Sequence, residues 1–260
     1  MKLNINDIEF NYNASPVLNG LTFQVEQGEF VAILGPNGSG KSTLLRCIDR
    51  ILKPRNGTIL LDNENIETMN RKNIAKKLAY VPQVESNTFP TTVYDTILLG
   101  RLPHIQWIPT RSDKEIVTDI IEKLQLTPFT LRKINQLSGG QRQKVFIGRA
   151  LAQKAPILLL DEPTANLDLK HQLEVMALLH EQTKQGVSIV IAIHDINLAL
   201  KYCQKIILLK NGTIHAAGGK EIITEKNMEE VYEIKASITE NAKGIFVIPE
   251  ESLGENDDTN

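Results

Sequence analysis

Runs of apolar residues alternate with helical patterns along most of the chain, which predicts an α/β fold with a mostly parallel sheet. The segments 30–34, 157–160 and 187–193 are almost entirely apolar, as is typical of strands buried on both faces. A shorter strand is predicted at 78–81, where Pro82 closes it. We therefore expect these four segments to lie at the centre of the molecule.

The first 30 residues have a different pattern, in which apolar and polar side chains alternate over 8–12 and 21–25. A period of two is typical of strands with one buried face, so we expect an antiparallel β subdomain at the N-terminus. The pairs Asn19-Gly20 and Gln27-Gly28 are predicted to be turns.

Strand signals disappear between about residue 86 and residue 155, and helical periodicity replaces them. Apolar residues recur at helical spacing over 93–99 and over 116–124, whereas two prolines make 101–109 irregular. We expect an α-helical lobe inserted between strands of the α/β core. Trp107 lies in the irregular segment, and two interpretations stay open: a contact with another protein, or an aromatic side chain folded back on its own lobe.

The C-terminal part of the chain is predicted to close the core and then leave it. The pair Asn211-Gly212 separates 206–210 from 213–216, which is typical of a β-hairpin. Residues 221–235 have a helical pattern and end the main domain. The remaining 236–260 form a C-terminal extension, and its last ten residues, rich in Glu and Asp, are expected to be a disordered tail.

A glycine-rich turn joins the first buried strand to a helical pattern. Its sequence is Gly35-Pro36-Asn37-Gly38-Ser39-Gly40-Lys41-Ser42-Thr43, which fits G-x-x-x-x-G-K-S. Glycines let backbone N–H groups converge on an anion, Lys41 would reach the β- and γ-phosphates of a nucleotide, and Ser42 would bind Mg²⁺. Apolar residues at helical spacing from Leu44 to Leu52 place the phosphates at a helix N-terminus. A glycine turn that binds nothing is the alternative, and its context argues against that.

Polar residues follow three of the predicted parallel strands at their carboxyl ends. Because these ends meet at one edge of a sheet, we expect Asp161 beside Mg²⁺ and Glu162 where it can polarise an attacking water. His194 is expected near the γ-phosphate, and the amide of Gln83 could reach a metal ion or a water. A solvated acidic turn and a structural histidine are the alternatives.

Ser138 and Gln141 have the spacing of a capping box at the start of a helical pattern. Between them, Gly139 and Gly140 occupy the first turn, where each costs about 1 kcal/mol relative to alanine. A cap alone does not explain these glycines. Small residues leave room for a phosphate to approach the free N–H groups.

The net charge, the apolar runs and the cysteines argue against several classes of protein. The net charge of −2 argues against a protein that coats nucleic acid, and no apolar run is long enough to span a bilayer. The two cysteines lie far apart and are expected to be core residues, which fits a reducing cytosol. Tyr12 ends a predicted strand, and two roles are open: packing in the sheet, which spacing alone favours, or stacking on an adenine ring.

These motifs, in this order, resemble the ATPase subunit of ABC transporters over about residues 1–235. The segment from Gly35 to Thr43 resembles the Walker A loop of that family, and 157–161 resembles its Walker B strand. Gln83 resembles the Q-loop glutamine, and Leu137 to Gln141 is similar to the signature sequence without a mismatch.

The remaining motifs of the family are matched as well. Glu162 corresponds to its catalytic glutamate, and the segment 166–168, with Asp168, resembles its D-loop. His194 resembles the H-loop histidine. Tyr12 matches the aromatic residue that stacks on adenine, so the resemblance reverses the expectation from spacing. It implies a P-loop NTPase core that binds ATP and Mg²⁺.

The resemblance also implies partners. Two ATPase subunits would face each other head to tail, with each ATP between the phosphate loop of one chain and the signature sequence of the other. Since only one set of motifs is present, the implied unit is a homodimer at the cytoplasmic face of the membrane. The surface around Gln83 and the helical lobe would receive a helix of a membrane permease. Residues 98–101 and 167–172 are similar to importers of iron chelates, haem and cobalamin, which also use an extracytoplasmic solute-binding protein.

Three other functions are alternatives to an importer motor. An exporter motor is the nearest alternative. A soluble ABC-type ATPase that acts on DNA or ribosomes usually has a long coiled coil or two tandem copies, and this chain has neither. A regulatory module that does not hydrolyse ATP would be expected to lose Glu162 or the signature sequence, and both are present.

Overall fold

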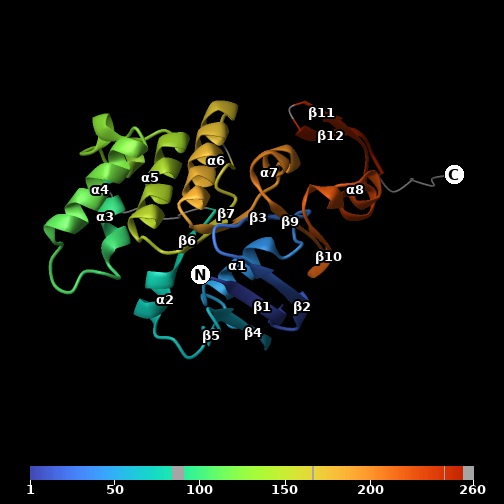
Figure 1. Ribbon diagram of the computed structural model, residues 1–260, viewed down its shortest axis with the longest axis horizontal. Helices are drawn as coiled ribbons and strands as arrows, with labels where there is room; N and C mark the ends of the chain where they lie inside the picture. Colours follow the sequence, from blue (N-terminus) through green and yellow to red (C-terminus); the bar gives the residue numbers. More distant parts are fainter. Residues whose placement is uncertain (84–90, 166, 243, 254–260) are drawn as a thin grey trace.

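A six-stranded sheet lies at the centre of the molecule, in the order β10-β9-β3-β8-β7-β6 (Figure 1). Strands β9, β3, β8, β7 and β6 are parallel, and β10 pairs antiparallel with β9 as the predicted hairpin. The prediction of a mostly parallel sheet is therefore confirmed. The bounds are β3 Phe30–Leu34, β6 Leu78–Val81, β7 Ile157–Asp161, β8 Ser188–Ala192, β9 Lys205–Lys210 and β10 Thr213–Gly218.

This computed structural model describes residues 1–83, 91–165, 167–242 and 244–253. The first residues expected in the helical lobe, Asn166 of the segment resembling the D-loop, and most of the expected tail lie outside that description.

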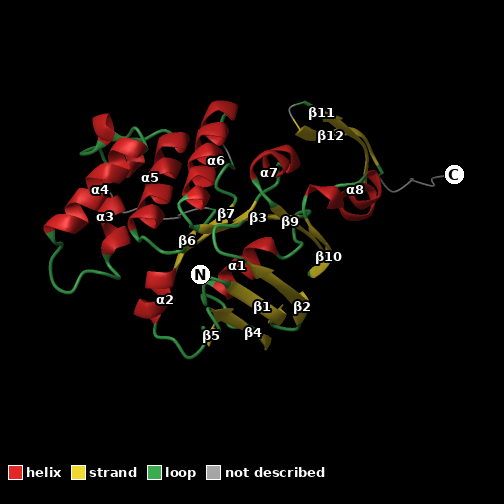
Figure 2. Ribbon diagram, viewed as in Figure 1, coloured by secondary structure: helices red, strands yellow, loops and turns green. Residues whose placement is uncertain are grey.

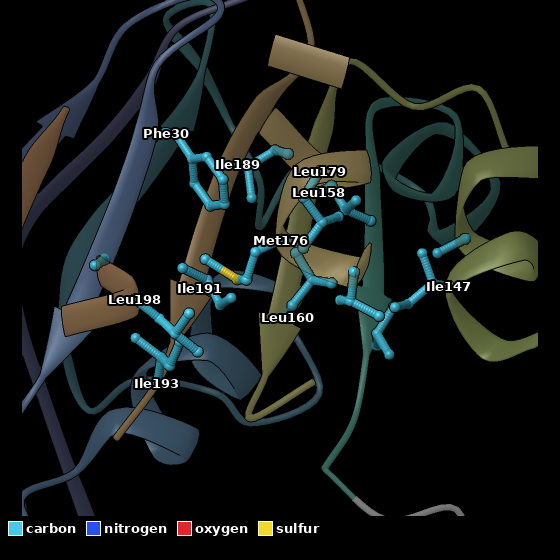
Figure 3. Packing of buried hydrophobic residues seen from close by; sticks show 14 of the residues in the cluster. Phe30, Ile147, Leu158, Leu160, Met176, Leu179, Ile189, Ile191, Ile193 and Leu198 are labelled. Carbon is cyan, nitrogen blue, oxygen red and sulfur yellow. The ribbon is translucent and has the colours of Figure 1, made fainter. Parts of the chain in front are cut away.

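Side chains on the two faces of the central sheet pack into two separate cores, because successive residues of a strand point to opposite faces. Val31 and Ile33 of β3 face the N-terminal sheet, whereas Phe30 and Ala32 face the helices on the other side. Burial on both faces is the reason that these strands are apolar without interruption. Figure 3 shows the helix-facing core, with Phe30, Leu158, Leu160, Met176, Leu179, Ile189 and Ile191 among the labelled side chains.

The N-terminal residues form an antiparallel sheet in the order β2-β1-β4-β5, as the alternating pattern predicts. The prediction of a turn at Asn19-Gly20 is wrong, because both residues lie inside β2 and the register with β1 shifts there. Gly20 has a φ of 67°, which suits a β-bulge rather than a reversal of the chain. The bounds are β1 Leu3–Tyr12, β2 Ser15–Val25, β4 Asn56–Leu61 and β5 Glu64–Asn65.

Helix α1 (Lys41–Ile48) packs its apolar side chains into the core shared by the two sheets. Helix α1 is shorter than the apolar spacing up to Leu52 predicts, since it ends at Ile48. Arg50 has a φ of 55°, a left-handed conformation that ends a helix, and Ile51 beyond it is half exposed.

The helical lobe, seen at the left of Figure 2, consists of α3 (Val93–Leu98), α4 (Arg111–Lys123) and α5 (Gly139–Ala152) with short 3-10 turns. The irregular segment between α3 and α4 is anchored by a buried ion pair, because Arg101 Nε lies 2.8 Å from Asp113 Oδ1. Trp107 in the same segment is 93% exposed, so the interpretation that it folds back on the lobe is wrong.

Further helices cover the sheet, and a hairpin ends the described chain. Helices α6 (Leu169–Lys184) and α7 (Ile196–Tyr202) pack on the face of the central sheet that is opposite the N-terminal sheet. Helix α2 (Arg71–Lys77) precedes β6. Helix α8 (Glu225–Tyr232) leads into strands β11 (Ile234–Asn241) and β12 (Gly244–Ser252), at the upper right of Figure 1.

This hairpin corrects the expectation for the last ten residues. Glu251 and Ser252 belong to β12 and pair with β11, so the tail that was expected to begin at residue 251 is structured at its start. The backbone N–H of Leu253 also donates to the carbonyl of Glu233 at 2.8 Å. Residues 254–260 lie outside the described structure.

Candidate functional site

The glycine-rich loop connects β3 to α1 and closes around the amine of Lys41. Lys41 Nζ donates hydrogen bonds to the carbonyl oxygens of Gly35 (2.8 Å) and Pro36 (2.9 Å). Burial lowers the pKa of Lys41, and the carboxylates of Glu162 and Asp161 oppose that shift. The loop therefore holds a largely buried cation at the N-terminus of a helix.

Two glycines of this loop serve different purposes. Gly35 packs against the backbone of β9, where no side chain would fit, because an added Cβ would lie 2.3 Å from the carbonyl oxygen of Leu209. At Gly38, with a φ of 79°, an added Cβ would meet nothing in the described structure within 4 Å. The buried hydroxyl of Ser39 has no hydrogen-bond partner among the described residues. An open concave backbone with an unused hydroxyl fits an anionic ligand such as a triphosphate.

Asp161 at the end of β7 is fully buried beside the loop. Ser42 Oγ donates to Asp161 Oδ1 at 2.8 Å, and the hydroxyl of Tyr80 donates to Oδ2 at 3.2 Å. Burial raises the pKa of Asp161, and these two hydrogen bonds oppose the rise. A hydroxyl and a carboxylate are the oxygen ligands that Mg²⁺ prefers, so this pair fits the expected metal.

Glu162, Gln83 and His194 come together from the ends of three neighbouring strands. Gln83 Nε2 donates to Glu162 Oε2, and His194 Nε2 lies 2.5 Å from Oε1 of the same carboxylate. Glu162 has a φ of 50°, and its backbone N–H donates to the carbonyl of Ala192 at 2.9 Å. Gln83 thus contacts Glu162 here, while its expected role toward a metal ion stays a prediction.

These groups share one cleft. A cleft of about 560 Å³ is lined by Val17, Asn37, Gly38, Gly40, Lys41, Ser42, Thr43, Gln83, Glu162 and His194. The structure therefore brings the phosphate loop and the three polar strand ends together, as the position of the strand ends predicts.

Tyr12 lies at the end of β1 and is 44% exposed. Its ring meets that of Phe10 edge to face, with centroids 4.9 Å apart. Arg46 of α1 forms hydrogen bonds to the hydroxyl of Tyr12 and to that of Tyr80, which in turn contacts Asp161. These hydrogen bonds raise the pKa of Arg46, the one to Tyr80 having the larger effect, while burial opposes the rise. Sequence reasoning missed Arg46 and Tyr80, because no motif spacing distinguishes them.

The second group of predicted residues lies at the start of α5. Ser138 and Gln141 form the expected capping box, since Gln141 N donates to Ser138 Oγ (3.3 Å) and Ser138 N donates to Gln141 Oε1 (3.1 Å). Around Gly139 an added Cβ would meet only open space within 4 Å in the described structure. At Gly140 it would lie 3.0 Å from the ring of His171. Only Gly139 therefore keeps the approach to the helix N-terminus open, whereas Gly140 makes room for a side chain.

Asp168 caps the neighbouring helix α6. Its Oδ1 accepts the backbone N–H of His171 at 2.9 Å and lies 2.6 Å from Nδ1 of the same ring. These hydrogen bonds lower the pKa of Asp168. His171 thus lies between Asp168 and Gly140, and its spacing of three residues from the cap was the signal that could have identified it. The residues of this second group do not appear among those lining the cleft.

Comparison with known proteins decides the family. Residues 18–165, more than half of the chain, match the ABC transporter family. The chain belongs to the ABC transporter family. As a member of it, this subunit binds ATP and is an ATPase. None of the helices in the described ranges combines the length and apolar character needed to cross a bilayer.

Several relatives resemble this ABC subunit over most of its length. It is 49% identical over 249 residues to an uncharacterized ABC transporter ATP-binding protein of Methanocaldococcus jannaschii, covering 95% of this chain and 97% of the relative. It is 36% identical to the iron(3+)-hydroxamate import ATP-binding protein FhuC of Bacillus subtilis, covering 91% and 89%. The cobalamin import ATP-binding protein BtuD of Halobacterium salinarum is 32% identical, with 95% of this chain and 63% of the relative covered.

Two solved structures have the same fold. A metal-chelate type ABC transporter in an inward-facing conformation superposes with a TM-score of 0.82 at 30% identity, covering 96% of each chain. The ATP-binding cassette MJ0796, solved as a dimer in a post-hydrolysis state with ADP and Pi, superposes with a TM-score of 0.75 at 30% identity. That match covers 84% of this chain and 98% of the other.

Proposed function

We propose that this chain is the ATP-hydrolysing subunit of an importer for a metal chelate, such as an iron–siderophore complex, haem or a cobalamin-type corrinoid. The observation that carries this proposal is the likeness, over 96% of the chain, to a metal-chelate type transporter. Relatives named for import of an iron(3+) hydroxamate and of cobalamin support the same class of cargo. Solute selection would belong to a permease and an extracytoplasmic binding protein.

The phosphate loop would hold the nucleotide through charge and backbone N–H groups. Lys41 now donates to two loop carbonyls, and we expect it to turn to the β- and γ-phosphates when ATP enters. Ser42 and Asp161 would hold Mg²⁺, which when bound neutralises charge on the phosphates. Tyr12, exposed at the end of β1, would stack on the adenine.

Glu162 would polarise the water that attacks the γ-phosphate. His194 would orient the γ-phosphate itself. Both carboxylate oxygens of Glu162 are occupied, one by Gln83 and one by His194. Attack therefore requires that one of these contacts give way to water. Gln83 is the group that would couple this change to a partner bound at the helical lobe.

The second half of each ATP site would come from another copy of this chain. Ser138, Gly139, Gly140, Gln141 and Asp168 lie outside the cleft lining, and the N-terminus of α5 is open at Gly139. A head-to-tail homodimer would bring this helix end to the triphosphate in the partner's cleft. The dimeric cassette with ADP and Pi supports that arrangement.

The helical lobe offers a surface for a membrane permease. It carries exposed apolar side chains that are unusual for a surface facing water alone. A permease bound there would keep the subunit peripheral at the cytoplasmic face of the membrane. These side chains are Leu99, Leu102, Trp107, Ile108 and Leu131.

The test is uptake by cells. In a strain that lacks this gene, uptake of ⁵⁵Fe-siderophore, haem and radiolabelled cobalamin is measured with the native gene or with Glu162→Gln restored. We expect one of the three uptake activities to return with the native gene and not with the variant. If none of the three uptake activities depends on the gene, and a compound instead accumulates inside the cells that lack it, the chain drives an exporter.

A further inference from the structure

The C-terminal hairpin contacts α7, the helix that begins two residues after His194. The side-chain amide of Asn197 pairs with the backbone of Val247 in β12 through two hydrogen bonds. Asn197 Nδ2 donates to the carbonyl of Val247 (3.1 Å), and the N–H of Val247 donates to Asn197 Oδ1 (2.9 Å). Both polar ends of one amide are therefore used by one residue of the hairpin.

Apolar packing supports the same contact. Val247 is 4% exposed and belongs to the helix-facing core, together with Leu198 and Ala199 of α7. Helix α7 is only seven residues long and is capped by Asp195, whose Oδ1 accepts the N–H of Leu198 at 2.9 Å. A helix this short takes its position from what it packs against, since propensity alone does not stabilise it.

The segment that carries the hairpin is also fixed to the central sheet. Lys210 at the end of β9 donates to the carbonyl of Glu230 and lies 3.0 Å from Glu233 Oε1, so α8 is fixed to the strand beside β3. The C-terminal segment is thus tied both to β9 and, through Asn197, to the helix after His194.

We propose that Asn197 is a positioning residue for ATP hydrolysis, through which the C-terminal hairpin sets the place of His194 relative to Glu162. Asn197 is three positions after His194 in the sequence, and the Asp195 cap between them fixes the first turn of α7. This inference rests on the role proposed above for His194. A displacement of about 1 Å at a reacting centre can cost on the order of 100-fold in rate, so a small shift of α7 is enough.

The test uses the full chain with Asn197→Ala, measuring kcat and KM for ATP. We expect kcat to fall about tenfold or more while KM changes less than about twofold, because the phosphate loop is untouched. Lys235→Ala is the matched control, since it cuts an exposed ion pair of the same hairpin (3.2 Å to Glu251) without touching α7. It should leave both constants unchanged.

A double-mutant cycle with His194→Ala separates positioning from general destabilisation. If Asn197 acts through His194, Asn197→Ala should cause no further loss of kcat in the His194→Ala background. An additional loss of the full size, or equal losses from Asn197→Ala and Lys235→Ala, would overturn the inference. Should Asn197→Ala not fold, Asn197→Asp keeps the side-chain volume and the acceptor for Val247 N–H, and normal kcat in that variant would overturn it as well.

The same cycle distinguishes the inference from the proposed function. If His194→Ala lowers kcat and Asn197→Ala does not, the hairpin inference fails while the role of His194 stands. If His194→Ala retains full activity, the proposed role of His194 fails first.

Discussion

At the scale of single residues, opposing electrostatic effects meet around the phosphate loop. Burial lowers the pKa of Lys41 and raises that of Asp161, so each of these groups lies in surroundings that disfavour its own charge. The nearby opposite charges and hydrogen bonds offset part of that cost. A bound triphosphate and its Mg²⁺ would complete the compensation.

Lys41→Ala should therefore weaken nucleotide binding itself. Removing the ammonium loses charge-assisted hydrogen bonds worth about 1.5–3 kcal/mol, which corresponds to roughly 10- to 100-fold in affinity. Titration calorimetry with ATP measures this directly. Unchanged affinity would contradict the role assigned to Lys41.

The sequence was sufficient for residues whose role depends on strand ends and motif spacing. Lys41, Asp161, Glu162 and His194 were expected at one edge of the sheet, and they line or border one cleft. It was insufficient for residues such as Arg46 and Tyr80, which act by contacts between distant segments. Such contacts depend on how elements pack, and no local pattern in the chain encodes them.

At the scale of elements, the strands that are buried on both faces could be predicted and the C-terminal hairpin could not. Uninterrupted apolar runs identify β3, β7 and β8, because both faces of the central sheet are covered. Strands β11 and β12 bury few side chains, Ala236 and Val247 being the most buried, so they leave no apolar period to find. The prediction of a turn at Asn19-Gly20 was wrong for a different reason, because a glycine with positive φ suits a β-bulge as well as a turn.

The helical lobe contains a buried ion pair that should make its stability depend on pH. Hydrogen bonds from Thr110, and then from Arg101, lower the pKa of Asp113 to about 2, against about 3.9 in an unfolded chain. A carboxyl with a depressed pKa contributes stability above its unfolded value and loses that contribution as the pH falls toward the folded one. The stabilising effect should therefore be complete above about pH 5 and be lost between about pH 4 and pH 2.

Asp113→Asn tests this expectation. The variant should have a lower melting temperature than the native chain near neutral pH, because the buried guanidinium of Arg101 loses its counter-charge. In denaturant titrations the difference in unfolding free energy should shrink as the pH falls from 4 to 2. A difference that stays constant over this range would contradict the assignment.

At the scale of the whole molecule, the separation of the two groups of site residues underlies the proposal that one chain is half of a catalytic unit. The cleft carries the phosphate loop and Glu162, whereas the residues proposed as the signature sequence lie at the start of α5 and outside the lining of that cleft. Coupling of ATP binding to association of two chains follows if each supplies what the other lacks.

Glu162→Gln should hold two chains together when ATP is present. Glutamine keeps the size of the side chain and the nucleotide contacts, but it cannot polarise water, so ATP would stay bound between the copies. Light scattering with saturating ATP should report a mass twice that of the chain, and omission of ATP should restore the monomer. A variant that stays monomeric with ATP would refute the shared site.

The chain has a single tryptophan, and that side chain stands almost wholly in water at the edge of the helical lobe. The indole emission of the protein therefore arises from one known point, next to the surface proposed for the permease. A partner that seats on this point would shift the emission toward the blue and shield it from dissolved quenchers. The subunit thus contains its own optical indicator of docking, and assembly can be followed in real time without attaching a dye.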